Sequence, residues 1–119
     1  MVKSFYELNI WQKGYELLMK IYEVTKKYPL EEKYSLATDT RRSANSVIAN
    51  IAESQGRYYF KDKNRVLYIA RGEVEETRSH LRVAKGKGYV REDIFFYLDK
   101  EYEGLSRGIS VFIKSLKPS

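Results

Sequence analysis

The segment "RRSANSVIANIAESQGR", residues 41–57, decides the fold. Apolar residues recur in it at intervals of three and four, which predicts an amphipathic helix. Between them lie serines, alanines and two asparagines, where leucine would bury more surface. Because short side chains let a neighbouring helix approach the backbone closely, we interpret this segment as a helix packed tightly against its neighbours.

The same helix carries a polar stripe. Its members follow one another at intervals of three and four, and they are Arg42, Ser46, Asn50, Glu53 and Arg57. Glu53 and Arg57 are spaced for an ion pair along the helix, which contributes about a few tenths of a kcal/mol when exposed. If the stripe is buried, its charged members need partners, and Glu76 is one candidate partner for an arginine.

The hydrophobic pattern predicts an all-α protein of four helices in a single domain, residues 1–119. Pro29 ends the first helix, Ser35 and Asp62 are suited to cap the second and third, and the "GKG" of residues 86–88 ends the third. Four helices with short connections predict an antiparallel up-down-up-down four-helix bundle. The expected helices cover residues 5–27, 35–56, 62–86 and 92–116.

Each expected helix has a set of residues that should face the core. In the middle of the chain the clearest members are Ala44, Val47, Ile48 and Ile51. In the first helix the set is Leu8, Trp11, Tyr15, Leu18, Tyr22 and Thr25.

Helices one and four carry further apolar residues outside these sets, which predicts that the protein self-associates. These residues are Ile10, Leu17, Ile21, Val24, Ile94, Phe96, Val111 and Ile113.

The composition excludes several classes of function. The chain has 119 residues and no cysteine, so disulfides and thiolate metal sites are excluded, and a cytoplasmic location is the expectation. Its apolar runs are too short to span a membrane, and its N-terminus lacks the pattern of a signal peptide. We therefore expect a soluble protein with no membrane partner.

Catalytic and metal-binding patterns are also missing. A ferritin-type di-iron site needs a Glu-x-x-His motif, but Thr77 stands three residues before the lone histidine, His80. We find no glycine-rich phosphate loop, no credible Ser-His-Asp set and no thiol nucleophile. The sequence therefore predicts no enzyme activity, no metal and no cofactor.

Positive charge is concentrated in the middle of the chain. Between Arg41 and Arg91 there are 12 Lys/Arg against 5 Asp/Glu, while the remaining residues hold 10 against 11. Such a surplus can bind RNA or DNA phosphates, although a solvated surface kept soluble by charge is the alternative. The candidate phosphate-binding residues are Arg57, Lys61, Lys63, Arg65, Arg71, Arg78, Arg82, Lys85 and Lys87.

An aromatic cluster lies within this basic region. Tyr58, Tyr59 and Phe60 stand between Arg57 and Lys61, in the expected loop between helices two and three. Basic and aromatic side chains together are typical of single-stranded nucleic-acid binding, because bases stack on the rings. The same rings can instead close the end of the bundle.

Four segments of the chain carry a resemblance to a known family. They are "FYELNIWQKGYEL", "TKKYP", "RRSANSVIANIAESQGR" and "YIARGEVEE". With them the chain resembles, from about Phe5 to Leu116, the four-helix-bundle proteins encoded by intervening sequences in bacterial 23S ribosomal RNA genes. The resemblance implies a homopentamer with a role in nucleic-acid binding. A more distant similarity is to the accessory protein of diversity-generating retroelements, a pentamer that engages nucleic acid and a reverse transcriptase.

The family's recurrent positions are present here almost throughout, with departures at Ser54 and Glu73, where members usually have glycine and serine. The resemblance implies an architectural role for these positions. Two hypotheses remain, a nucleic-acid-binding module and a protein-interaction scaffold or accessory factor for an enzyme such as a reverse transcriptase. The matching positions are Trp11, Pro29, Arg42, Ser46, Asn50, Ile51, Ala52, Glu53, Arg57, Ala70, Arg71, Gly72 and Glu76.

Overall fold

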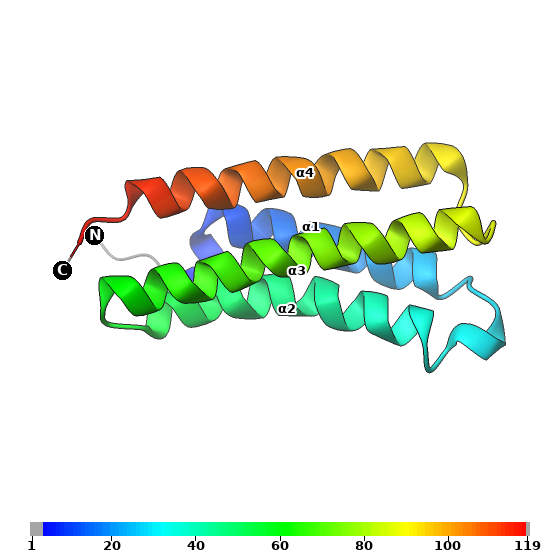
Figure 1. Cartoon of the computed structure of the whole chain (residues 1–119), viewed down its shortest axis with the longest axis horizontal. Coiled ribbons are helices and arrows are strands. Elements are labelled where there is room, and N and C mark those ends of the chain that lie inside the picture. Colours follow the sequence, from blue (N-terminus) through cyan, green and yellow to red (C-terminus); the bar gives the residue numbers. More distant parts are fainter. Residues whose placement is uncertain (1–3, 119) are drawn as a thin grey trace.

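Four helices run side by side along one long axis and form an antiparallel bundle (Figure 1). The computed structural model describes residues 4–118, and the bundle measures 48 × 25 × 20 Å. The predicted all-α up-down-up-down architecture is confirmed. The elements are η1 (Phe5–Glu7), α1 (Asn9–Thr25), η2 (Leu30–Glu32), α2 (Leu36–Gly56), α3 (Phe60–Gly86) and α4 (Glu92–Ser115).

Each helix packs against the one before it, and α4 returns to lie beside α1. The α2–α3 pair makes the most extensive contact and the α1–α4 pair the least. Both chain ends lie at the end of the bundle where α2 turns into α3, whereas the α1–α2 and α3–α4 connections lie at the opposite end (Figure 1). The basic residues at the two ends of α3 are therefore separated by almost the full length of the bundle.

Two predicted helix boundaries need correction. The first α-helix begins at Asn9, because Leu8 has an extended backbone (φ −71°, ψ 132°) that separates α1 from the short turn η1. The third begins at Phe60, with Tyr59 at the N-cap position. Asp62 therefore lies in the first turn of α3, where a carboxylate interacts favourably with the helix dipole, and does not cap the helix.

The prediction for the core-facing side of α2 is confirmed. Ala44, Val47, Ile48 and Ile51 are all at most 7% exposed. Ala49, by contrast, is exposed, so its small size does not serve a contact within the protomer.

A buried hydroxyl pair also joins α2 to α3. Ser43 of α2 and Thr77 of α3 are fully buried, and their hydroxyl oxygens lie 2.7 Å apart. Each hydroxyl is also within donating distance of a backbone carbonyl of its own helix, at 3.1 Å from Ser43 to Thr40 and at 2.9 Å from Thr77 to Glu73. Serine and threonine at these two positions thus pack closely without leaving a buried polar group unsatisfied.

The predicted core-facing side of α1 is wrong in part. Tyr15 and Tyr22 are each 44% exposed, whereas Leu17 and Ile21 are fully buried. Because α1 contacts α2 on one side and α4 on the other, its buried strip is centred on Gly14, Leu17, Leu18 and Ile21. The tyrosines lie at the edge of that strip, where the ring packs and the hydroxyl stays in water.

Much of the predicted self-association surface is instead buried within the protomer, because α1 packs against both α2 and α4. Leu17, Ile21 and Ile113 belong to the core of the protomer itself. Ile10, Val24 and Ile94 are partly buried against that core. Only Phe96 and Val111 of the predicted set are largely exposed, at 54% and 67%.

A glycine sets the approach of α1 to α2. A Cβ atom added at Gly14 would lie 2.4 Å from Ile48 Cγ2, well inside van der Waals contact. Ile48 is β-branched and buried, so its methyl group has little freedom to move away. At Gly72 on α3, by contrast, an added Cβ would meet no heavy atom within 4 Å.

We predict opposite effects of alanine at these two glycines. Gly14→Ala should lower the free energy of unfolding by about 1–3 kcal/mol, because the methyl group overpacks the α1–α2 contact. Gly72→Ala should raise it by up to about 1 kcal/mol, because alanine is the better helix former and has room. Urea unfolding of both variants measures the difference, and a stabilised Gly14→Ala would contradict the close approach.

Candidate nucleic-acid interface

The α2–α3 turn is short and tied in place. Helix α2 ends at Gly56 and α3 begins at Phe60, so only three residues connect them. Arg57 and Tyr59 both have extended backbones, which turn the chain back on itself. Lys63 Nζ donates a 3.1 Å hydrogen bond to the carbonyl of Ser54 in the last turn of α2, which also accepts a hydrogen bond from the backbone N–H of Arg57.

The two tyrosines of this turn lie in solvent. Tyr58 is 81% exposed and Tyr59 62%. Their rings are 5.1 Å apart and nearly perpendicular, at 88°. They therefore do not close the end of the bundle, and their faces are open to a planar ligand.

One lysine and one arginine beside the tyrosines have no acidic partner. Lys61 and Arg65 are exposed and lie one helical turn apart on α3, and neither forms an ion pair within the residues that the structure describes. Arg57 differs, because its Nη2 lies 3.4 Å from Glu53 Oε2, the predicted pair along the helix. We call Tyr58, Tyr59, Lys61 and Arg65 the end cluster.

Farther along α3 the cations are engaged by α4. Arg78 binds Asp99 in a bidentate way, with Nε 2.8 Å from Oδ1 and Nη2 3.1 Å from Oδ2. Glu75 and Glu103 add carboxylates at 3.2 and 3.7 Å. The hydrogen bond to Arg78 lowers the pKa of Asp99, and the same bond raises the pKa of Arg78.

The remaining cations of α3 also have neighbours. Arg82 Nη2 lies 3.7 Å from Asp99 Oδ2, and Lys85 Nζ lies 3.9 Å from Glu92 Oε1. Lys87 is at the far end, with Nζ 5.7 Å from the centre of the Tyr89 ring. The structure therefore does not gather the predicted phosphate-binding residues into one surface.

Arg71 lies between these two groups. Its guanidinium is 5.4 Å from the centre of the Tyr68 ring, and its Nε is buried without a hydrogen-bond partner. It contributes charge to the middle of α3 and belongs to neither end.

The family-pattern residues have structural contacts. Arg42 forms an ion pair with Glu76 on α3, as the sequence predicts, and lies 3.9 Å from Glu73 as well. On α2, Asn50 Nδ2 donates 2.8 and 3.1 Å hydrogen bonds to the backbone carbonyl and the hydroxyl of Ser46.

Trp11 has an aromatic environment on α1. Its ring stacks on Tyr15, with centroids 5.3 Å apart and an angle of 13°, and meets the edge of Phe5 at 5.4 Å. It is half-buried and packs against the core. These contacts stabilise the start of the bundle.

Sequence reasoning missed Asp99, the residue that binds Arg78. Asp99 and Glu103 stand four residues apart on the predicted fourth helix, a spacing that places both on one face. This spacing indicates that the two carboxylates share one face of the helix, but it does not indicate which neighbouring helix they face. Their pairing with Arg78 depends on the alignment of α3 against α4.

Residues 4–118 lack two further kinds of feature. No three or more His, Asp or Glu side chains are grouped closely enough to hold a metal ion. No helix in this part of the chain is both long and apolar enough to cross a membrane.

The fold and its polar contacts define a small four-helix-bundle protein. Its class is specified further by comparison with known proteins, since a model of the 23S rRNA-intervening sequence protein family matches residues 6–111. The chain belongs to that family.

The fold is also seen in solved structures, one of which is similar in its overall shape. It is a protein with unknown function from the S23 ribosomal protein family of Bacteroides thetaiotaomicron, with a TM-score of 0.82 and 22% identity. The match covers 89% of this chain and 96% of the other. No curated protein matches the sequence.

We predict that the Arg78–Asp99 pair makes stability depend on acid. Asp99→Asn should lower the free energy of unfolding at pH 7 by about 1–3 kcal/mol, because the partly buried guanidinium of Arg78 loses its bidentate charged acceptor. A carboxyl whose pKa is lowered on folding stabilises the protein above its unfolded pKa of about 3.9 and loses this effect as pH falls through the folded value.

The difference between wild type and Asp99→Asn should therefore shrink as pH falls below about 4. Urea unfolding at several pH values measures it. Glu53→Gln, which breaks the exposed pair with Arg57, serves as the control and should change little. An Asp99→Asn variant as stable as wild type at pH 7 would contradict the role of the pair.

Proposed function

We propose that this protein is a non-catalytic module that binds RNA or DNA phosphates through the end cluster, with little sequence preference. The observation that carries the proposal is the pair of exposed cations without acidic partners, Lys61 and Arg65, beside two exposed tyrosine rings. Phosphates bound by lysine and arginine release counterions, which gives affinity without reading the bases. Stacking on tyrosine favours single-stranded segments.

The cations held by α4 are less suited to this role. Arg78 is bound by Asp99 and flanked by Glu75 and Glu103, so a phosphate would have to compete with carboxylates already in place. Lys61 and Arg65 have no such competition within residues 4–118. Among the candidate residues predicted from the sequence, those of the end cluster are therefore best placed to bind a phosphate backbone.

Self-association is part of the proposal. A complex of several copies would present several end clusters, and weak contacts to one nucleic acid would then add up to useful affinity. Exposed Phe96 and Val111 on α4 supply apolar surface that contact between copies can cover. The protein would act in the cytoplasm, where RNA and DNA are available.

The second candidate is a protein-interaction scaffold, or an accessory factor for a nucleic-acid enzyme such as a reverse transcriptase. The same apolar residues of α4 favour it, because they can bind another polypeptide as well as a second copy. It predicts no measurable affinity for nucleic acid by the protein alone.

We predict a steep salt dependence of RNA binding that is carried by the end cluster. In fluorescence anisotropy with a single-stranded oligonucleotide, log K should fall linearly with log of the salt concentration. Lys61→Gln combined with Arg65→Gln should weaken binding and reduce the slope by about 2, about 1 for each lost phosphate contact. The matched control, Lys100→Gln combined with Lys114→Gln, removes the same charge from exposed positions on α4 and should change the slope less.

Two results would count against the proposal. No association of the wild-type protein at low ionic strength would exclude phosphate binding and favour the scaffold. Equal losses in the two double variants would show that net charge, and not the end cluster, determines affinity.

A further inference from the structure

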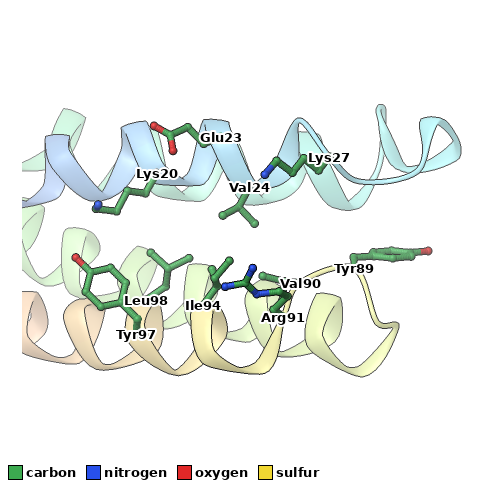
Figure 2. A pocket seen from close by; sticks show the side chains of 10 residues that line it. All are labelled: Lys20, Glu23, Val24, Lys27, Tyr89, Val90, Arg91, Ile94, Tyr97 and Leu98. Atoms are coloured by element: carbon green, nitrogen blue, oxygen red, sulfur yellow. The ribbon is translucent and has the colours of Figure 1, made fainter.

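A groove lies between α1 and α4 near the α3–α4 connection, at the end of the bundle opposite the α2–α3 turn (Figure 1 and Figure 2). It encloses about 370 Å³. Figure 2 shows Val24 of α1 pointing across the groove toward Ile94 of α4, with Leu98 and Val90 beside it. The helices that border it are the pair with the least extensive contact, which explains why the side chains do not fill the space. We call it the α1–α4 groove.

The rim of the α1–α4 groove is mainly cationic. Lys20, Lys27 and Arg91 stand around it, with Glu23 as the one acidic lining residue. Arg91 is partly neutralised by Asp93, since its Nε lies 3.0 Å from Oδ1. Lys20 lies over the ring of Tyr97, at 5.4 Å. An apolar floor with a cationic rim fits a ligand that offers an apolar side chain beside a carboxylate.

The chain itself offers such a group. In the connection between α1 and α2, Leu30 is 83% exposed and Tyr34 85%, with Glu31 exposed between them. The neighbouring Glu32 anchors this connection, because it accepts a 2.9 Å hydrogen bond from the Tyr89 hydroxyl and one of 2.7 Å from Ser35. Lys33 also belongs to this connection, with its Nζ 5.3 Å from the centre of the Tyr34 ring, so residues 30–34 carry two glutamates against one lysine. We call Leu30, Glu31 and Tyr34 the acidic knob.

A protomer does not fill its own groove with this knob. Leu30 lies on the α1–α2 side of the bundle, where it lines a shallow hollow with Thr25 and Arg41. The groove lies on the α1–α4 side. Both features belong to the same end of the bundle, near the C-terminal end of α1 (Figure 1). The complementary surfaces are therefore available to two different copies.

We infer that the acidic knob of one copy docks into the α1–α4 groove of the next. Leu30 then covers the apolar floor, and Glu31 pairs with Lys27, a rim cation with no acidic partner within residues 4–118. The contact is heterologous, since it joins two different surfaces, and repetition of such a contact gives a closed ring when the rotation between copies allows it. The inference rests on the proposed self-association and names its surfaces.

Charge reversal tests the contact in the full-length chain. Size exclusion with light scattering should give the wild type a mass several times 14.1 kDa. Leu30→Asp, Glu31→Lys and Lys27→Glu should each weaken self-association about tenfold or more, as expected for residues at the centre of a contact. The double variant with both Glu31→Lys and Lys27→Glu should recover most of the loss, because the pair is restored with its signs exchanged. Asp39→Lys, at an exposed position of α2, is the control and should leave the mass unchanged.

Cysteine cross-linking supplies a second readout. The chain has no cysteine of its own, so introduced thiols report without background. Oxidation of a variant with Leu30→Cys and Ile94→Cys should give a ladder of disulfide-linked copies on a non-reducing gel. A variant with Tyr58→Cys and Ile94→Cys, which places one thiol at the opposite end of the bundle, should give no such ladder.

The outcomes separate this inference from the proposed function. An oligomer that persists in the Leu30 and Glu31 variants and gives no ladder would overturn the knob-in-groove contact while leaving self-association intact, and would assign the groove to another occupant. A wild-type protein of 14.1 kDa would overturn both the contact and the self-association. RNA binding by that monomer would still support the role of the end cluster.

Discussion

The close packing of α2 between α1 and α3 is the constraint on which the rest of the structure depends. On one side Gly14 of α1 allows Ile48 of α2 to approach within the space that a methyl group would occupy. On the other side Ser43 and Thr77 bring α2 and α3 together through hydroxyls that bond to each other and to backbone carbonyls. Small side chains in the segment of residues 41–57 thus let α2 pack closer to its neighbouring helices than large side chains would allow.

This packing also determines where charge is available. With α3 held against α2, its outer side is left to meet α4, and Asp99 takes up Arg78 and approaches Arg82. Within residues 4–118, Lys61 and Arg65 in the first two turns of α3 form no ion pair, and neither does Arg71 farther along the helix. The end cluster is thus a part of the basic middle of the chain that the ion pairs with α4 do not engage.

The sequence predicts the fold and most of the core because periodicity reports burial directly. It identifies the core residues of α2, and it names Glu76 as one candidate partner of an arginine, which the structure shows to be Arg42. It misplaces the buried strip of α1, because it assigns Tyr15 and Tyr22 to the core. A tyrosine has an apolar ring and a polar hydroxyl, so its place in a hydrophobic pattern does not show whether it lies inside the core or at its edge.

The candidate site is less predictable than the fold. Whether Arg78 or Arg65 is free depends on the alignment of α4 against α3, which pairs residues about twenty positions apart in the chain. The α1–α4 groove was also not predicted, since it arises from the separation of two helices and has no local pattern. Tertiary placement, and not residue type, distinguishes the paired cations from the free ones.

The most direct test of the account is to locate bound nucleic acid on the protein. Ultraviolet cross-linking to a single-stranded RNA, followed by mass spectrometry of the peptides, reports which segment contacts the bases. We expect cross-links within residues 57–65, at Tyr58 and Tyr59 above all. Cross-links confined to residues 78–87, where α4 already engages the cations, would contradict it.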